Sequence, residues 1–221
     1  MDRAGRLRGA GWVLGSVGLV LLVGSLLWLR GSYGTATVRS DSMTPAHAAG
    51  DRVLYERVGG GELERGDVVL FRAPDRYPFD APVVQRVIGV GGDRVSCCTG
   101  AGAGERLAVN GRPLAEPYVR DGIADGMRRP YDVKVPQGRL FLLGDHRRDS
   151  LDSRFFTDHG GTVPAGAVEG RVTDGYAVVV LLAVAALAGL LLLLAGLVCV
   201  IAARVRRRRA AEPAEFRPAR L

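Results

Sequence analysis

The residues best suited to chemistry in this sequence lie in the stretch Ser40-Asp41-Ser42-Met43-Thr44-Pro45. Two serine hydroxyls stand two residues apart, just before a proline that resists regular structure and about ten residues beyond an apolar segment long enough to cross a bilayer. A hydroxyl here would lie near the membrane surface. The alternative is a turn or capping cluster, because Ser, Asp and Thr side chains readily bond to their own backbone.

Two more polar clusters follow along the chain. The second is Val84-Gln85-Arg86-Val87-Ile88-Gly89, with Gly91-Gly92-Asp93 behind it, and the third runs from Gly144-Asp145-His146-Arg147 into Ser150-Leu151-Asp152-Ser153-Arg154. Asp152 and Arg154 are two residues apart, which puts them on one face of an extended segment. Alternatively, Ser150 and Asp152 are turn residues, and Asp152 with Arg154 forms a surface ion pair worth about 0 to 1 kcal/mol.

In this order, the three clusters resemble the type I signal peptidases, which are membrane-anchored Ser–Lys proteases. The resemblance covers most of residues 36–175 and extends to Gly66-Asp67-Val68-Val69 and to the Asn110-Gly111 turn with Glu116-Pro117-Tyr118. Adjacent cysteines after the second cluster, paired apolar spans and an arginine-rich composition resemble the actinobacterial branch. The resemblance implies a serine endopeptidase that removes signal peptides from exported preproteins, prefers small residues before the cut, and needs no cofactor and no metal.

The resemblance also implies roles for single residues. Ser42 matches the nucleophile, Ser40 the hydroxyl that helps the backbone N–H of residue 42 to stabilise the oxyanion, and Ser150 the hydroxyl that orients the base. Three charged residues of the third cluster match positions that support the site: Asp145, Asp152 and Arg154.

The second cluster departs from the family where the family has its catalytic lysine. That position is Gln85 here, and an amide has no basic nitrogen, so it can orient the Ser42 hydroxyl but cannot take its proton. Loss of a general base typically costs about 10² to 10⁴ in rate. The alternative function is therefore a catalytically impaired relative that binds precursors or a membrane partner through the same groove.

Three other side chains are chemically able to replace the missing base. Lys134 is the one lysine in the sequence, and its segment alternates like a strand, so we expect it to be solvated. His47 and His146 titrate near neutral pH, but the sequence does not place either of them next to Ser42. His159 is expected to lie in a loop.

Two apolar runs predict membrane-spanning helices. Residues 10–29 contain no charge and match a hydrocarbon core of about 30 Å, and residues 176–203 form a second run that is followed by an arginine cluster. A cleaved signal peptide is the alternative for the first run, although the run exceeds a typical signal-peptide core of about 7 to 15 residues. Basic flanks predict that tails 1–9 and 204–221 are cytoplasmic and that residues 30–175 form an extracytoplasmic domain on the cytoplasmic membrane.

The domain between the spans is predicted to be mainly β, with antiparallel strands. Short apolar runs separated by Gly, Pro and Asp occur at residues 52–55, 67–71, 83–90, 107–109, 131–135 and 140–143. No segment of this domain keeps a helical apolar period over ten residues. Asn110-Gly111 predicts a two-residue hairpin turn.

The charge distribution argues against a nucleic-acid-binding protein, and the cysteines argue against a zinc protein. The net charge is +7, of which +2 lies in residues 1–8 and +5 in residues 204–221, so the middle of the chain offers no basic field and no nucleic-acid partner is expected. The C-terminal arginines are explained by topology, with contact to anionic membrane lipid as a secondary effect. Cys97 and Cys98 are interpreted as two small buried side chains, because a disulfide between neighbours would be strained, and no zinc site is expected there.

Overall fold

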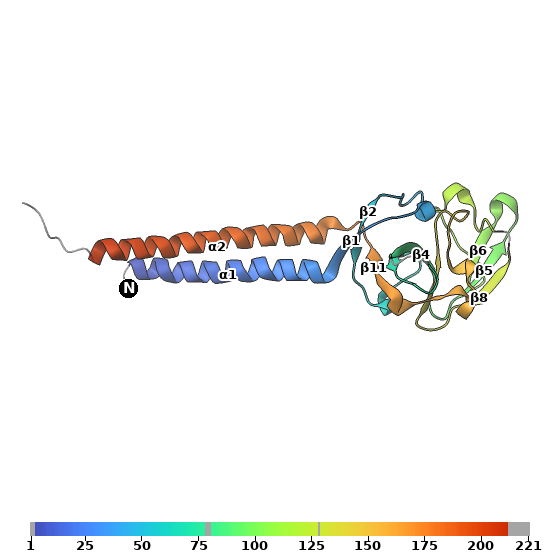
Figure 1. Ribbon diagram of the computed structural model, residues 1–221, viewed down its shortest axis with the longest axis horizontal. Helices are drawn as coiled ribbons and strands as arrows, with labels where there is room; N and C mark the ends of the chain where they lie inside the picture. The colour runs from blue at the N-terminus through green and yellow to red at the C-terminus, as the bar shows by residue number, and fades with distance from the viewer. Residues whose placement is uncertain (1–2, 78–80, 128, 212–221) are drawn as a thin grey trace, which may run out of the picture. The chain divides into compact units, whose positions relative to one another are not determined.

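The computed structural model describes residues 3–77, 81–127 and 129–211, and it divides into two compact units. One unit contains the helices α1 (Arg3–Ser32) and α2 (Tyr176–Ala211), and the other is the strand-rich segment Ser32–Asp174 (Figure 1). Within these helices, Gly5–Ser32 and Tyr176–Arg209 are long and apolar enough to span a membrane. Large apolar side chains are exposed along both helices, as expected for surfaces that face lipid.

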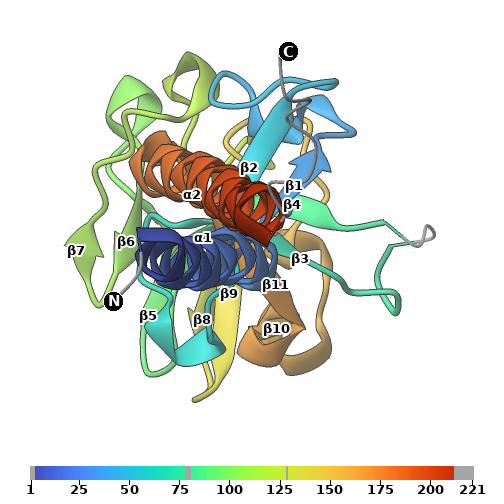
Figure 2. The ribbon, with the colours of Figure 1, turned by 90° about the vertical axis from the view of Figure 1, so that its left-hand side faces the viewer.

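The two helices pack side by side through glycines (Figure 2). A Cβ atom placed on Gly18 would lie 2.5 Å from the carbonyl oxygen of Gly189, and one on Gly11 would lie 2.8 Å from that of Gly196. Small residues let helix backbones approach closely, which favours association where lipid removes the hydrophobic drive. The glycines therefore fix where the two helices touch.

The strand-rich unit contains two antiparallel sheets. The seven-stranded sheet has the order β1-β2-β11-β3-β4-β9-β10, and the four-stranded sheet has the order β7-β6-β5-β8. In the first sheet the strands are β1 (Tyr33–Thr37), β2 (Arg52–Glu56), β3 (Val68–Phe71), β4 (Val83–Gly89), β9 (Arg139–Leu143), β10 (Val163–Pro164) and β11 (Val168–Val172). In the second they are β5 (Arg94–Thr99), β6 (Arg106–Val109), β7 (Arg112–Pro113) and β8 (Tyr131–Lys134), and Figure 1 shows β5, β6 and β8 together at one end of this unit.

The predicted fold class, mainly β with two apolar helices, is confirmed. Each of the six apolar runs forms a strand, and the hairpin turn at Asn110-Gly111 joins β6 to β7 with φ angles of 53° and 75°. The strands enclose three buried apolar clusters: one around Val69, Phe71 and Leu142, one around Ile88, Leu107 and Leu143, and one around Val38, Met43 and Leu70.

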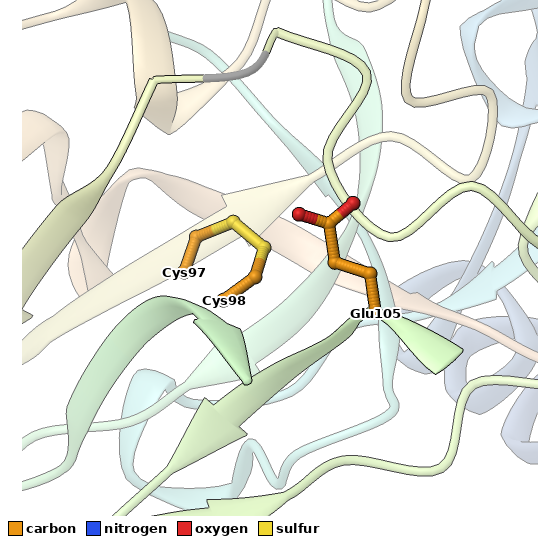
Figure 3. A group of neighbouring side chains, drawn as sticks. All are labelled: Cys97, Cys98 and Glu105. Carbon is orange, nitrogen blue, oxygen red and sulfur yellow. A yellow bond between two sulfur atoms is a disulfide. The ribbon is translucent and has the colours of Figure 1, made fainter. Parts of the chain in front are cut away.

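The interpretation of Cys97 and Cys98 as two separate buried side chains is wrong. Their sulfur atoms form a disulfide on β5, across a cis peptide bond that leaves the two Cα atoms 3.0 Å apart. The pair packs against the apolar cluster around Ile88 and Leu107. Figure 3 shows the carboxylate of Glu105 beside the disulfide, and because the sulfurs are bonded to each other they are not thiolate ligands.

Candidate active site

The nucleophile candidate Ser42 lies in a short 3-10 turn, Asp41–Met43, that is tied to the rest of the domain. Met43 is fully buried in an apolar cluster, and the carbonyl oxygen of Ser42 accepts a hydrogen bond from the backbone N–H of His146 at 2.9 Å. The carboxylate of Asp41 accepts one from the N–H of Ala49 at 2.9 Å. These contacts fix the backbone of the turn, so the hydroxyl starts from a defined position.

The two hydroxyls of the first cluster contact each other. Ser40 has extended backbone angles, and its Oγ lies 3.0 Å from the Oγ of the half-buried Ser42. This geometry excludes the simplest form of the turn-cluster alternative for Ser42. Its side chain bonds to another side chain rather than to its own backbone.

The third cluster brings Ser150 against the same turn. A Cβ atom on Gly144 would collide with the Ser150 hydroxyl and would lie 2.5 Å from the carbonyl oxygen of Ser42. Glycine at this position therefore allows three segments to meet without a side chain between them. The Ser150 hydroxyl is buried, the residue being 4% exposed, and it has no hydrogen-bond partner among the described residues.

Gln85, on β4, is 1% exposed and has an oriented amide. Its Nε2 donates to the carbonyl oxygen of Leu151 at 2.7 Å and to the Oη of Tyr77 at 3.2 Å. Burial, together with the charge of Asp152, raises the pKa of Tyr77 to about 12. The phenol therefore stays protonated at neutral pH and cannot replace the missing lysine as a base.

Two cavities meet at Ser42. One, of about 410 Å³, is lined by Ser40, Ser42, Gln85 and Ser150 together with Tyr77, Val83, Arg148, Asp149, Leu151 and Phe155. The other, of about 320 Å³, is lined by Val38, Arg39, Ser40, Ser42, Pro82, Val83 and Val84. The structure thus brings the four residues predicted for catalysis to one place, although they come from segments up to 110 positions apart in the sequence.

The supporting residues are buried, so the interpretation of Asp152 and Arg154 as a surface pair is wrong. Arg154, with a side chain that is 1% exposed, donates to both oxygens of Asp152 at 2.7 Å. Asp152 also accepts from the N–H of Gly144 at 3.1 Å. Asp145 is fully buried and pairs with Arg86 through two hydrogen bonds of 2.9 and 2.6 Å.

A second buried pair was not predicted from the sequence. Arg147, whose side chain is fully buried, forms an ion pair with Glu116 and donates to the carbonyl oxygen of Gly144 at 2.9 Å. Arg154 donates to the carbonyl oxygen of Arg147 at 2.9 Å and pairs with Asp125. The charges therefore form one connected network behind the loop that contains Ser150, and that network supports the loop.

Within the described residues, no side chain of an alternative base hydrogen-bonds to the Ser42 hydroxyl. Lys134 is exposed on β8 of the four-stranded sheet, opposite Arg94, which confirms the expectation of a solvated strand lysine. His146 contacts Ser42 through its backbone, but its Nδ1 lies 3.9 Å from Asp149, and His47 bonds to Met43 through its backbone. Among the described residues that line the two cavities there is no lysine or histidine.

Fold and site together define a class: a peptidase with a strand-rich domain, a serine at the junction of two cavities, and two apolar helices. Comparison with known proteins gives the family. Residues 10–176 match the family described as signal peptidase, peptidase S26. The chain belongs to this family and is a serine endopeptidase of the signal peptidase I type, anchored in a membrane.

Several relatives are similar over most of the chain. A signal peptidase I of Mycobacterium tuberculosis (strain H37Rv) is 31% identical over 209 residues, covering 72% of this chain and 69% of its own. A signal peptidase IB of Staphylococcus aureus (strain COL) is 32% identical over 154 residues, covering 62% and 74%. A solved signal peptidase I from Enterococcus faecalis is 27% identical and covers 51% of this chain and 97% of its own, with a TM-score of 0.38.

Proposed function

We propose that this enzyme removes signal peptides from exported preproteins, with Ser42 as the nucleophile. The observation that supports this most directly is the position of Ser42, where two cavities meet and a second hydroxyl lies 3.0 Å away. The Oγ would attack the carbonyl carbon of the scissile bond. The oxyanion would then accept hydrogen bonds from the Ser42 N–H and the Ser40 hydroxyl, and the C–N bond would break so that the amine of the mature protein leaves with the proton lost by Ser42. Water would finally hydrolyse the ester on Ser42 and release the signal peptide.

The strand β4 offers a place for an extended substrate. Val83, Val84 and Gln85 pair with β3 on one side, whereas the pairing of β4 with β9 begins only at Arg86. Within the described residues, the other side of this backbone faces no strand partner over Val83 to Gln85, so a peptide can add there as a strand. The cavity of about 320 Å³, walled by Val38, Val83 and Val84, suits small residues before the cut.

The same proposal places the protein in the cytoplasmic membrane. Tails 1–9 and 204–221 are cytoplasmic, residues 10–29 and 176–203 span the membrane, and residues 30–175 form the extracytoplasmic domain. Arg8, Arg204 and residues 206–209 support this orientation, since basic residues favour the cytoplasmic side. The arginines after the second span also favour contact with anionic lipid.

We further propose that Gln85 makes the enzyme slow. Both hydrogen bonds of its Nε2 are donated to oxygen atoms, and an amide does not accept the proton that Ser42 must release. Asp145, Asp152 and Arg154 would still support the site, and Ser150 would still face the position of the missing amine. The named relatives are all peptidases, so they lend no support to the alternative of a relative that only binds precursors.

An acylating inhibitor tests the nucleophile. Purified full-length protein in detergent is treated with a serine-acylating signal-peptidase inhibitor, and the adduct is located by mass spectrometry of the digested protein. The adduct is expected on Ser42 and should vanish in Ser42→Ala. Ser40→Ala is the matched control, because it removes a neighbouring hydroxyl and should leave a slower reaction at the same residue. Labelling that persists unchanged in Ser42→Ala would refute the assignment.

A further inference from the structure

Arg39 presents an unpaired positive charge at the substrate cavity. It is exposed, it lines the cavity of about 320 Å³ together with both hydroxyls of the first cluster, and it makes no hydrogen bond or ion pair within the described part of the chain. The acidic residues nearest to it in sequence are otherwise engaged. Asp41 accepts from the N–H of Ala49 at 2.9 Å, and Asp51 from the N–H of Ala48 at 2.8 Å.

Most other arginines of the strand-rich unit are paired with a carboxylate. Ion pairs join nine of the sixteen that the structure describes to acidic side chains of the unit: Arg65, Arg72, Arg76, Arg86, Arg94, Arg120, Arg147, Arg154 and Arg171. An unpaired exposed arginine is commonly just a solvated side chain. Arg39 differs because it lines a largely apolar cavity beside the candidate nucleophile, where a bound peptide would displace water.

The second cavity provides an internal contrast. Arg148 lines it and is also unpaired in the described residues, but Asp149 lines the same cavity and offsets its charge. A substrate would therefore meet a net positive charge at the cavity that Arg39 lines, and one charge of each sign at the cavity that Arg148 and Asp149 line. A preference for acidic substrate residues should therefore arise at the cavity that Arg39 lines and not at the other cavity.

We propose that Arg39 is a specificity residue that favours substrates with an aspartate or glutamate next to the small residue that fills the apolar cavity. This inference rests on the proposed function, since it assumes that the peptide runs past Ser42. In an extended peptide, neighbouring side chains point to opposite faces, so one residue can enter between Val38 and Val84 while the next one reaches the rim. An arginine at that rim fits a carboxylate through paired hydrogen bonds.

Peptide binding tests the proposal without requiring turnover. A fluorescent peptide with alanines at the third and first positions before the cut is titrated into full-length protein in detergent, and its anisotropy is recorded. Aspartate and asparagine are compared at each position from five before to three after the cut. One position should bind about two- to fivefold more tightly as aspartate than as asparagine, the range of a partly solvated ion pair. The preference should shrink between 50 and 500 mM salt.

Charge reversal identifies the residue responsible. Arg39→Glu should invert the preference, so that lysine at the same position binds more tightly than aspartate, whereas Arg112→Glu is the matched control because it makes the same charge change on β7 and should leave the preference intact. Aspartate and asparagine binding equally at every position, a preference that survives Arg39→Glu, or no saturable binding of any peptide would each overturn the proposal. Acylation of Ser42, measured on the same preparation, separates this failure from a failure of the proposed function.

Discussion

Replacing Gln85 by lysine should convert this site into a faster enzyme. Gln85 is buried and its amide nitrogen already lies 2.7 Å from the carbonyl oxygen of Leu151. A lysine amine can donate to that carbonyl and also to the Ser150 hydroxyl, which has no partner in the described residues. Burial lowers the pKa of a lysine from about 10.4, which leaves a useful fraction of neutral amine near pH 7.

The size of the gain follows from the role of the group. A positioned general base typically contributes about 10² to 10⁴ in rate, which corresponds to about 3 to 5 kcal/mol of activation free energy. The loss of folding free energy should be smaller, about 1 to 3 kcal/mol. The hydrogen bond from the Gln85 amide to Tyr77 is lost, whereas the hydrogen bond to the carbonyl oxygen of Leu151 can be formed by the lysine amine instead. We therefore expect kcat/KM for a signal-peptide substrate to rise at least a hundredfold in Gln85→Lys.

The assay measures cleavage of a preprotein by full-length protein in detergent from pH 6 to 10. In Gln85→Lys, kcat/KM should rise with pH through the pKa of the amine, because only the neutral form accepts the proton. Gln85→Arg is the matched control for charge, since a guanidinium stays protonated and cannot act as a base. Gln85→Met is the control for size, and neither control should exceed the unmodified protein.

Two results would refute this reasoning. If the unmodified protein matched Gln85→Lys, another base would have to exist, and His47→Ala and His146→Ala would locate it. If Gln85→Arg gained as much as Gln85→Lys, the missing contribution would be charge rather than proton transfer.

The positions around the site and between the helices give three further predictions. Arg147→Met leaves a buried carboxylate without its partner and should cost about 3 to 5 kcal/mol of unfolding free energy in urea; a loss below 1 kcal/mol would contradict the buried pair. Gly144→Ala places a methyl group 2.5 Å from the carbonyl oxygen of Ser42, so inhibitor labelling of Ser42 should slow at least tenfold. Unchanged labelling would show that the backbone around Gly144 moves to accommodate the methyl group without disturbing Ser42. Gly18→Leu should lower the melting temperature in detergent, whereas Gly24→Leu, which meets open space, should not.

The sequence predicts much of the fold because its apolar runs are separated by clear turn residues. The six predicted strands and the Asn110-Gly111 hairpin all form. Strands β1, β5, β10 and β11 were not predicted. In β5 and β11, for example, Arg94–Thr99 and Val168–Val172 mix polar and apolar residues and are specified by their neighbours in the sheet. The disulfide was not predicted because the Cα atoms of neighbouring cysteines lie nearer to each other than a relaxed disulfide prefers.

The predicted site residues come together, but their electrostatic support could not be read from the sequence. Arg147 pairs with Glu116 across 31 positions, and Arg154 contacts Asp125 across 29. Each partner is an ordinary charged residue in a polar stretch, and only the folded chain shows that all four are buried. No local sequence pattern encodes this burial, so the sequence alone does not show that these ion pairs support the site from inside the domain.

The geometry of the nucleophile does not depend on the residue at position 85. The turn that contains Ser42 is fixed by the burial of Met43, by the N–H of His146 and by the bond from Ala49 to Asp41. None of these contacts involves Gln85, whose amide bonds to Tyr77 and Leu151 instead. Position and proton transfer are therefore separable in this enzyme. A lysine introduced at position 85 would enter a site that is already arranged, so the gain in kcat/KM should report the base alone.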